Sequence, residues 1–130
     1  MKKKAKNIHL KYSFFVNEDR NYYRKKRKYK NMIDVWGGWN LFQELLVILD
    51  DIAKKHNTMV ANVATKFILD KPTVVGVIIG VRLGISEHRD DNAKVFGLNL
   101  DDEDNAKIKS VVSKANDLFD KIGDCGSEYR

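Results

Sequence analysis

The chain has 130 residues, of which 43% are hydrophobic and 32% are charged, a composition typical of a globular domain and unlike that of a disordered chain. Its longest apolar run, residues 74–79, is far shorter than the ~20 residues that a membrane-spanning helix needs, so the sequence predicts no transmembrane segment. Cys125 is the only cysteine, and the lysine-rich start lacks the apolar stretch of a signal peptide. We therefore expect a cytoplasmic protein without an internal disulfide.

Charge divides the chain into two parts near residue 30. Residues 1–30 hold 12 Lys or Arg against Glu18 and Asp19, a net charge of +10, whereas the remaining residues hold 12 basic and 16 acidic side chains, a net charge of −4. Apart from one strand candidate at 10–16, neither helical nor strand periodicity organises the basic part. We expect residues 1–30 to form a basic, mostly irregular N-terminal arm and residues 31–130 to form the folded domain.

Two helices are expected to follow the WGGW sequence. Apolar residues recur at steps of three and four over residues 41–53, which predicts an amphipathic helix with Asn40 as its N-cap and an end near His56. A histidine suits that end because a cation complements the helix dipole. A second helix is predicted from residue 58 or 59 to 69, and Pro72 follows its end because proline disfavours helical backbone in the residue before it.

One strand and two further helices are expected after Pro72. The continuous β-branched run VVGVII at 74–79 is typical of a buried strand in a parallel sheet. Ser86 is predicted to cap a helix that reaches Phe96, and Asp101 to cap a longer one that runs to about Ile122. The chain should thus be mostly helical, with four helices and one or two strands. A single buried strand cannot form a sheet, so it must pair with the arm or with a partner outside this domain.

The segment after the predicted strand has the features of an anion-binding site. Arg82 lies in a glycine-containing loop ahead of a capped helix, and a helix N-terminus presents free N–H groups and a positive dipole to a phosphate. His88, Asp91 and Asn92 share one helix face because they are three and four residues apart. These residues alone leave two interpretations open: a nucleotide laid across the helix, or an ordinary strand-to-helix turn with Arg82 in solvent.

Three longer runs resemble one protein family. The run VVGVIIGVRLGISEHRDDNAKVFGLNLDDED resembles the last barrel strand, cofactor-binding loop and helix of the aldo-keto reductases. Upstream, KYKNMIDVWGGWNLFQELLVILDDIAKKHNTMVANVATKFILDKP resembles the preceding loop and helices, and IGDCGSEYR resembles the C-terminus of a plant and microbial branch. The resemblance covers roughly residues 28–130. It implies an α/β fold, with this chain as the C-terminal segment of a (β/α)8 TIM barrel that is incomplete, because such barrels usually need ~250 residues.

The resemblance implies cofactor binding without catalysis. Gly80 and Arg82 would approach the phosphates of NADP(H), and the adenosine and 2′-phosphate end would be lined by Ser86, His88, Asp91 and Asn92. The family's catalytic Asp, Tyr, Lys and His lie on earlier barrel strands, so this chain should be inactive alone and bind the cofactor weakly or not at all. No His and Cys cluster has metal-ligand spacing, and no metal is expected.

Two other functions stay open. Residues 2–30 combine lysine, arginine and tyrosine, a mixture that contacts phosphates and stacks on bases, which would make the chain a binding module for nucleic acid or an anionic surface. Alternatively, the chain packs an exposed strand edge and apolar faces against another chain, such as a related reductase, as a structural partner. Trp36 and Trp39 are either packing anchors or stacking platforms for a ligand.

Overall fold

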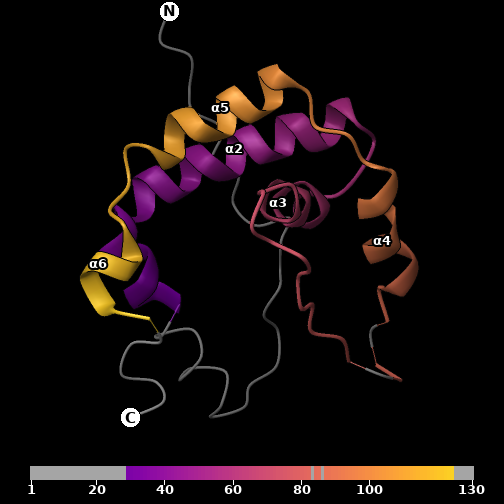
Figure 1. Ribbon diagram of the computed structural model, residues 1–130, viewed down its shortest axis with the longest axis horizontal. Helices are drawn as coiled ribbons and strands as arrows, with labels where there is room; N and C mark the ends of the chain where they lie inside the picture. The colour runs from indigo at the N-terminus through magenta and orange to yellow at the C-terminus, as the bar shows by residue number, and fades with distance from the viewer. Residues whose placement is uncertain (1–28, 83, 86, 125–130) are drawn as a thin grey trace, which may run out of the picture. The chain divides into compact units, whose positions relative to one another are not determined.

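A computed structural model of the chain describes residues 29–82, 84–85 and 87–124 (Figure 1). The strand candidate at 10–16, Ser86 and all but the last two residues of the basic arm lie outside the described residues. The chain divides into two compact units, Met1–Met32 and Ile33–Arg130. Helical backbone covers residues 29–36, and the remaining elements all belong to the second unit.

Helices α2 (Trp39–Lys55) and α3 (Val60–Leu69) confirm the first two predicted helices. α2 ends at its C-cap His56, as expected, but it begins two residues before the predicted start. Its N-cap is Gly38 rather than Asn40, with φ of 87°, a backbone conformation that glycine adopts without steric cost. The N-cap of α3 is Met59, whose side chain makes no capping hydrogen bond. Periodicity thus located both helices, whereas cap chemistry misplaced one start.

Two short helical elements and then the longer helix α5 follow the extended segment after α3. α4 (Arg89–Ala93) continues directly into the 3-10 helix η1 (Lys94–Gly97), so the predicted helix from Ser86 to Phe96 is shorter than expected and starts after His88. α5 (Asp102–Val112) confirms the predicted Asp101 cap. The Asp101 carboxylate accepts from the Asp104 amide at 2.8 Å, and the Asp104 carboxylate accepts from the Asp101 amide at 3.3 Å. This reciprocal capping box satisfies two backbone donors that an uncapped helix would leave unpaired.

The predicted long helix to Ile122 is wrong, because α5 ends at Val112 and α6 (Leu118–Ile122) begins separately behind an Asp117 cap. A tertiary contact explains the break. The Asn116 amide donates to the Trp36 carbonyl at 2.7 Å, and its side-chain amide donates to the Val35 carbonyl at 2.9 Å. In an unbroken helix the Asn116 amide would bond within the helix instead. These bonds satisfy carbonyls at the end of the 29–36 helix.

The core lies where α2, α3 and α5 meet. Figure 1 shows α5 running alongside α2, with α3 seen end-on beside α2. Ile52, Val63 and Ile108 each contribute a side chain that is no more than 2% exposed. The buried cluster around them is completed by two residues of α2 and two of the segment that leads into α5: Leu49, Ala53, Leu98 and Leu100. Apolar burial between helices therefore holds this unit together.

The predicted strand at 74–79 is wrong for the structure described. Residues 74–81 are extended but form no strand, and Val75 and Ile78 are fully exposed to solvent. No β-strand occurs anywhere in the described residues, where six α-helical segments replace the four predicted. The physical reason is that a strand needs neighbours for its N–H and C=O groups, and the described residues supply none. Within the same residues, no helix has the length and apolar character to cross a membrane.

Candidate functional site

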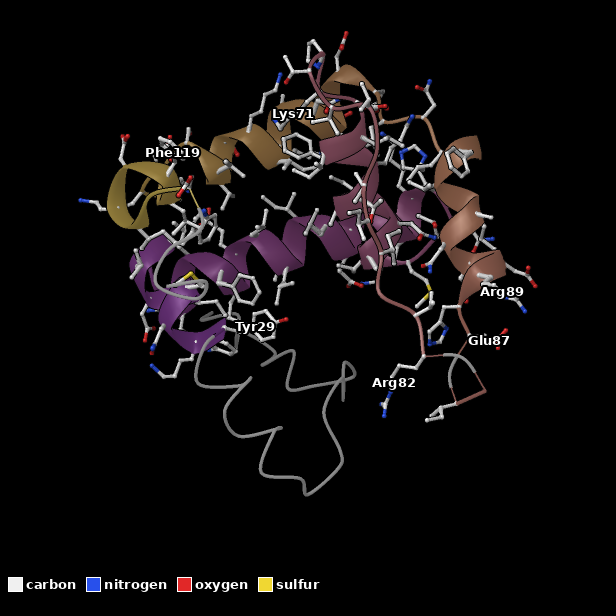
Figure 2. The ribbon with its side chains drawn as sticks, turned by 60° about the horizontal axis from the view of Figure 1, so that its bottom comes forward. Tyr29, Lys71, Arg82, Glu87, Arg89 and Phe119 are labelled. Atoms are coloured by element: carbon white, nitrogen blue, oxygen red, sulfur yellow. The ribbon has the colours of Figure 1, made fainter. Side chains whose placement is uncertain are left out.

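The extended segment from 74 to 82 carries the first two candidate site residues. The Val74 amide donates to the Lys71 carbonyl at 3.0 Å, which fixes the turn between α3 and this segment. Gly80 is exposed, and a Cβ added there would meet no atom within 4 Å, so packing does not require glycine at this position. Figure 2 shows the Arg82 side chain pointing away from the helices. Its guanidinium is therefore presented to solvent and to any anion that approaches the segment.

Glu87 organises the loop between Arg82 and α4. Its Oε1 accepts from the Gly84 amide at 3.1 Å, and its Oε2 lies 2.5 Å from the Arg89 guanidinium. Gly84 has φ of 74°, which favours glycine in this turn. Glu87 and Arg89 lie together across the loop from Arg82 (Figure 2). Sequence reasoning missed both, although their opposite charges on either side of His88 were the available signal.

His88 and Asp91 come together at the start of α4. His88 is the N-cap residue, but its side chain makes no capping hydrogen bond. Its Nδ1 lies 4.0 Å from the Asp91 carboxylate, which also accepts from Lys94 Nζ at 2.7 Å. The hydrogen bond from Lys94 lowers the pKa of Asp91, so this carboxylate is ionised at neutral pH. The first turn of α4 thus presents a histidine next to a paired carboxylate.

Asn62 anchors α4 on α3. This buried side chain, 3% exposed, donates through Nδ2 to Thr58 Oγ1 at 3.0 Å and to the Asp91 carbonyl at 2.9 Å. A buried amide without such partners would cost free energy; the bond to Thr58 is local, and the bond to the Asp91 carbonyl joins α3 to α4. Sequence reasoning did not single out Asn62. The signal was a polar residue next to Val63 on the buried side of a predicted helix.

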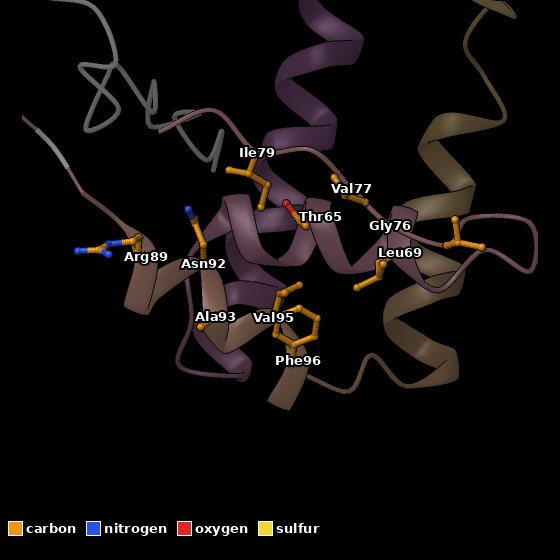
Figure 3. A pocket seen from close by; sticks show the side chains of 11 residues that line it. Thr65, Leu69, Gly76, Val77, Ile79, Arg89, Asn92, Ala93, Val95 and Phe96 are labelled. Carbon is orange, nitrogen blue, oxygen red and sulfur yellow. The ribbon is translucent and has the colours of Figure 1, made fainter. Parts of the chain in front are cut away.

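Asn92 lies in the wall of a groove, apart from His88 and Asp91 (Figure 3). The groove has a volume of about 440 Å³ and runs between α3, the extended segment and the α4–η1 turn. Its lining is mostly apolar, with Arg89 and Asn92 near one end. Other lining residues include Thr65, Leu69, Val77, Ile79, Val95 and Phe96. The structure therefore places Asn92 beside an apolar space and places His88 and Asp91 elsewhere on the same short helix.

A second polar cluster joins the end of α2 to the start of α5. The Asp104 side chain is fully buried, and its two carboxylate oxygens lie 2.8 Å from Lys55 Nζ and 2.6 Å from His56 Nε2. Lys55 Nζ also lies 2.5 Å from Asp101. His56 thus reaches from its cap position to the neighbouring helix. Because every carboxylate here has partners, the cluster is a structural tether between helices.

The charges of this tether stabilise one another. The hydrogen bonds that Lys55 donates to Asp101 and Asp104 raise the pKa of Lys55, and the bond that Asp101 accepts from Lys55 lowers the pKa of Asp101 to about 2. Burial raises the pKa of Asp104, but the hydrogen bonds from Lys55 and His56 outweigh burial and lower it overall. The two carboxylates are therefore ionised at neutral pH.

Both tryptophans of the WGGW sequence contact Phe42. The Trp36 and Phe42 ring centroids are 6.5 Å apart at an interplanar angle of 89°, and those of Trp39 and Phe42 are 6.0 Å apart. Trp36 is half-buried, whereas Trp39 is 57% exposed. Edge-to-face packing accounts for Trp36 as an anchor of α2. Across the described residues, no three His, Cys, Asp or Glu side chains are placed to hold a metal ion.

Comparison with known proteins identifies the family. The model of the aldo/keto reductase family matches residues 10–113, and the chain therefore belongs to that family. It is an oxidoreductase family whose members typically use NAD(P)H and whose fold is a TIM barrel. The match starts inside the basic segment and ends one residue after α5. Neither a curated protein nor a solved structure matches the chain significantly.

Proposed function

We propose that this chain is a C-terminal portion of an NADP(H)-dependent aldo-keto reductase of the plant and microbial branch. In this proposal it contributes the adenosine and phosphate end of the cofactor site and does not transfer hydride alone. The observation that carries the proposal is the unbroken order of extended segment, Arg82, loop and α4, with Arg82 presented to solvent. The matched residues 10–113 are also fewer than half of the ~250 residues of a typical barrel.

The described residues fit one end of a dinucleotide. The missing side chain at Gly80 lets a phosphate approach the backbone, and the Arg82 guanidinium offers two parallel donors to it. The ionised Asp91 can accept from ribose hydroxyls but would repel a 2′-phosphate, so Arg89 must supply the compensating charge, while His88 offers a hydrogen-bonding ring nitrogen. Bound NADPH supplies the hydride, while these side chains hold and orient it. Ser86 belongs to the same proposal but lies outside the described residues.

The proposal of an inactive chain is supported by the described residues, which hold no enclosed candidate for the proton donor. Carbonyl reduction needs a positioned acid whose pKa is tuned by an enclosed environment. In the part of the chain that the structure describes, Tyr29 is the only tyrosine, and it is 59% exposed. An exposed side chain is not held in the enclosed setting that such an acid needs. A cytoplasmic location belongs to the proposal as well. Residues 2–30, the candidate for binding nucleic acid, lie almost wholly outside the residues that the structure describes, so no observation supports that function.

Replacing Arg82 with alanine should weaken NADPH binding about tenfold, because a charge-assisted phosphate contact of moderate strength is lost. The matched control is Lys109→Ala, which removes one exposed cation from α5, far along the chain from the proposed site. Cofactor fluorescence titration at fixed ionic strength gives the dissociation constants. Equal losses in both variants would mean that NADPH responds only to net charge, and the proposed site would be abandoned.

The same preparation tests the proposed lack of turnover. Unmodified chain mixed with NADPH and a panel of aldehydes and ketones should oxidise no cofactor above the protein-free background. Steady NADPH consumption that scales with chain concentration would contradict the proposal that this chain lacks the catalytic machinery.

A further inference from the structure

Glu87 holds two donors of its loop at once. Its Oε1 accepts from the Gly84 amide at 3.1 Å, and its Oε2 lies 2.5 Å from Nη2 of Arg89. The Glu87 side chain is 32% exposed, whereas that of Arg89 is 71% exposed. Both side chains lie across the loop from Arg82 (Figure 2). One carboxylate of the chain thus occupies a backbone N–H group and a guanidinium that are close enough to share a single anion.

These two donors are of the kind that hold a phosphate. Backbone N–H groups and arginine are common phosphate contacts, because both donate to oxygen and arginine adds a full positive charge. A carboxylate has the same sign of charge and offers two acceptor oxygens. Gly84 directs its amide from a backbone with φ of 74°, which favours glycine, so the loop itself sets one of the donors. Glu87 therefore stands where a phosphate group of a ligand would bind.

A phosphate and the Glu87 carboxylate cannot share Arg89 without repulsion. Like charges a few ångströms apart repel, and they do so more strongly away from bulk water. Asp90 and the ionised Asp91 add further negative charge in the first turn of α4. Lys94, the cation that follows α4, already pairs with Asp91 at 2.7 Å. Arg89 must therefore release Glu87 before it can hold a phosphate.

We propose that Glu87 is a specificity-determining residue of the proposed cofactor site, because its carboxylate competes with the 2′-phosphate of the ligand for Arg89. This inference rests on the cofactor function proposed above. A ribose with a free 2′-hydroxyl leaves the ion pair intact, whereas the pair has to break before Arg89 can hold a 2′-phosphate. Glu87 thus lowers the preference for NADP(H) over NAD(H) that Arg89 alone would give. Because an exposed ion pair is weak, the effect on affinity is a few-fold change.

Glu87→Gln in the full chain tests the competition. Glutamine keeps the size of the side chain and an acceptor for the Gly84 amide, but it removes the negative charge next to Arg89. Titration calorimetry at low, fixed ionic strength should show that adenosine 2′,5′-bisphosphate binds about threefold more tightly than to the unmodified chain, while the affinity for adenosine 5′-monophosphate stays unchanged. The helical circular dichroism spectrum should be the same for both chains.

Two further variants separate competition from net charge. Asp90→Asn removes one negative charge from an exposed residue beside Arg89 in the sequence, and it should change the affinity less than Glu87→Gln does. In an Arg89→Ala background, Glu87→Gln should bring no gain in affinity, because the group for which Glu87 competes is missing.

Three results would overturn the inference and leave the proposed cofactor site standing. They are an equal gain from Asp90→Asn, a gain from Glu87→Gln that persists without Arg89, and unchanged or weaker binding of the bisphosphate by Glu87→Gln. If neither adenosine ligand binds to the unmodified chain or to any variant, the proposed cofactor site itself is wrong, and the inference about Glu87 falls with it.

Discussion

Replacing Asp104 with alanine should lower the free energy of unfolding by about 3 kcal/mol, since it breaks a buried, hydrogen-bonded ion pair and removes half of a capping box. Asp104 is fully buried and joins Lys55 and His56 of α2 to the first turn of α5. Its loss leaves Lys55 Nζ and His56 Nε2 without the carboxylate that both of them contact. Urea unfolding followed by helical circular dichroism gives the difference directly.

The control for this prediction is Asp102→Ala. Asp102 carries the same charge in the same first turn of α5, but it is exposed. Its replacement should change the free energy of unfolding by no more than about 0.5 kcal/mol. If the two alanine variants lose the same stability, the loss reflects only the helix dipole, and Asp104 does not tether α5 to α2.

Replacing Ile108 with alanine should cost about 3 kcal/mol, because the residue is 2% exposed in the cluster formed by α2, α3 and α5. The cavity left behind would lie between helices that cannot fully close around it. Val112→Ala is the matched control, one turn further along α5 and 38% exposed, with an expected cost below about 1 kcal/mol. A cost for Ile108→Ala as small as that of the control would mean that α5 does not pack against α2 as described.

Local signals were sufficient for the helices that the sequence located. The apolar repeat over residues 41–53 defines one face of α2, and Asp101 with acidic residues after it defines the start of α5. Both signals depend on residues within a few positions of one another. The break after Val112 had no such signal, since it depends on bonds from Asn116 to carbonyls some 80 positions earlier.

The error at residues 74–79 has a different cause. β-branched residues indicate what a segment needs, a covered and paired environment, and not whether its neighbours are present. The prediction of a buried strand was therefore conditional on partners that the described residues do not provide. The exposure of Val75 and Ile78 is the structural consequence.

The candidate site was only partly accessible from sequence. The pattern of a loop before a capped helix identified Arg82, His88, Asp91 and Asn92, and resemblance to the family added Gly80 and the cofactor roles of these residues. Glu87 and Asn62 could not be found that way, since their roles appear only through the bonds that they make to the Gly84 amide and the Asp91 carbonyl. Supporting residues of this kind depend on tertiary contacts.

Amide-resolved NMR titration with adenosine 2′,5′-bisphosphate tests the proposed cofactor site, because this ligand is the part of NADP(H) that the site would hold. We expect the amide signals of Gly80, Arg82, His88 and Asp91 to shift with one common dissociation constant while those of α5 stay in place, and adenosine 5′-monophosphate to bind more weakly. Unchanged signals from residues 80–92 at saturating ligand, or shifts confined to other residues, would contradict it.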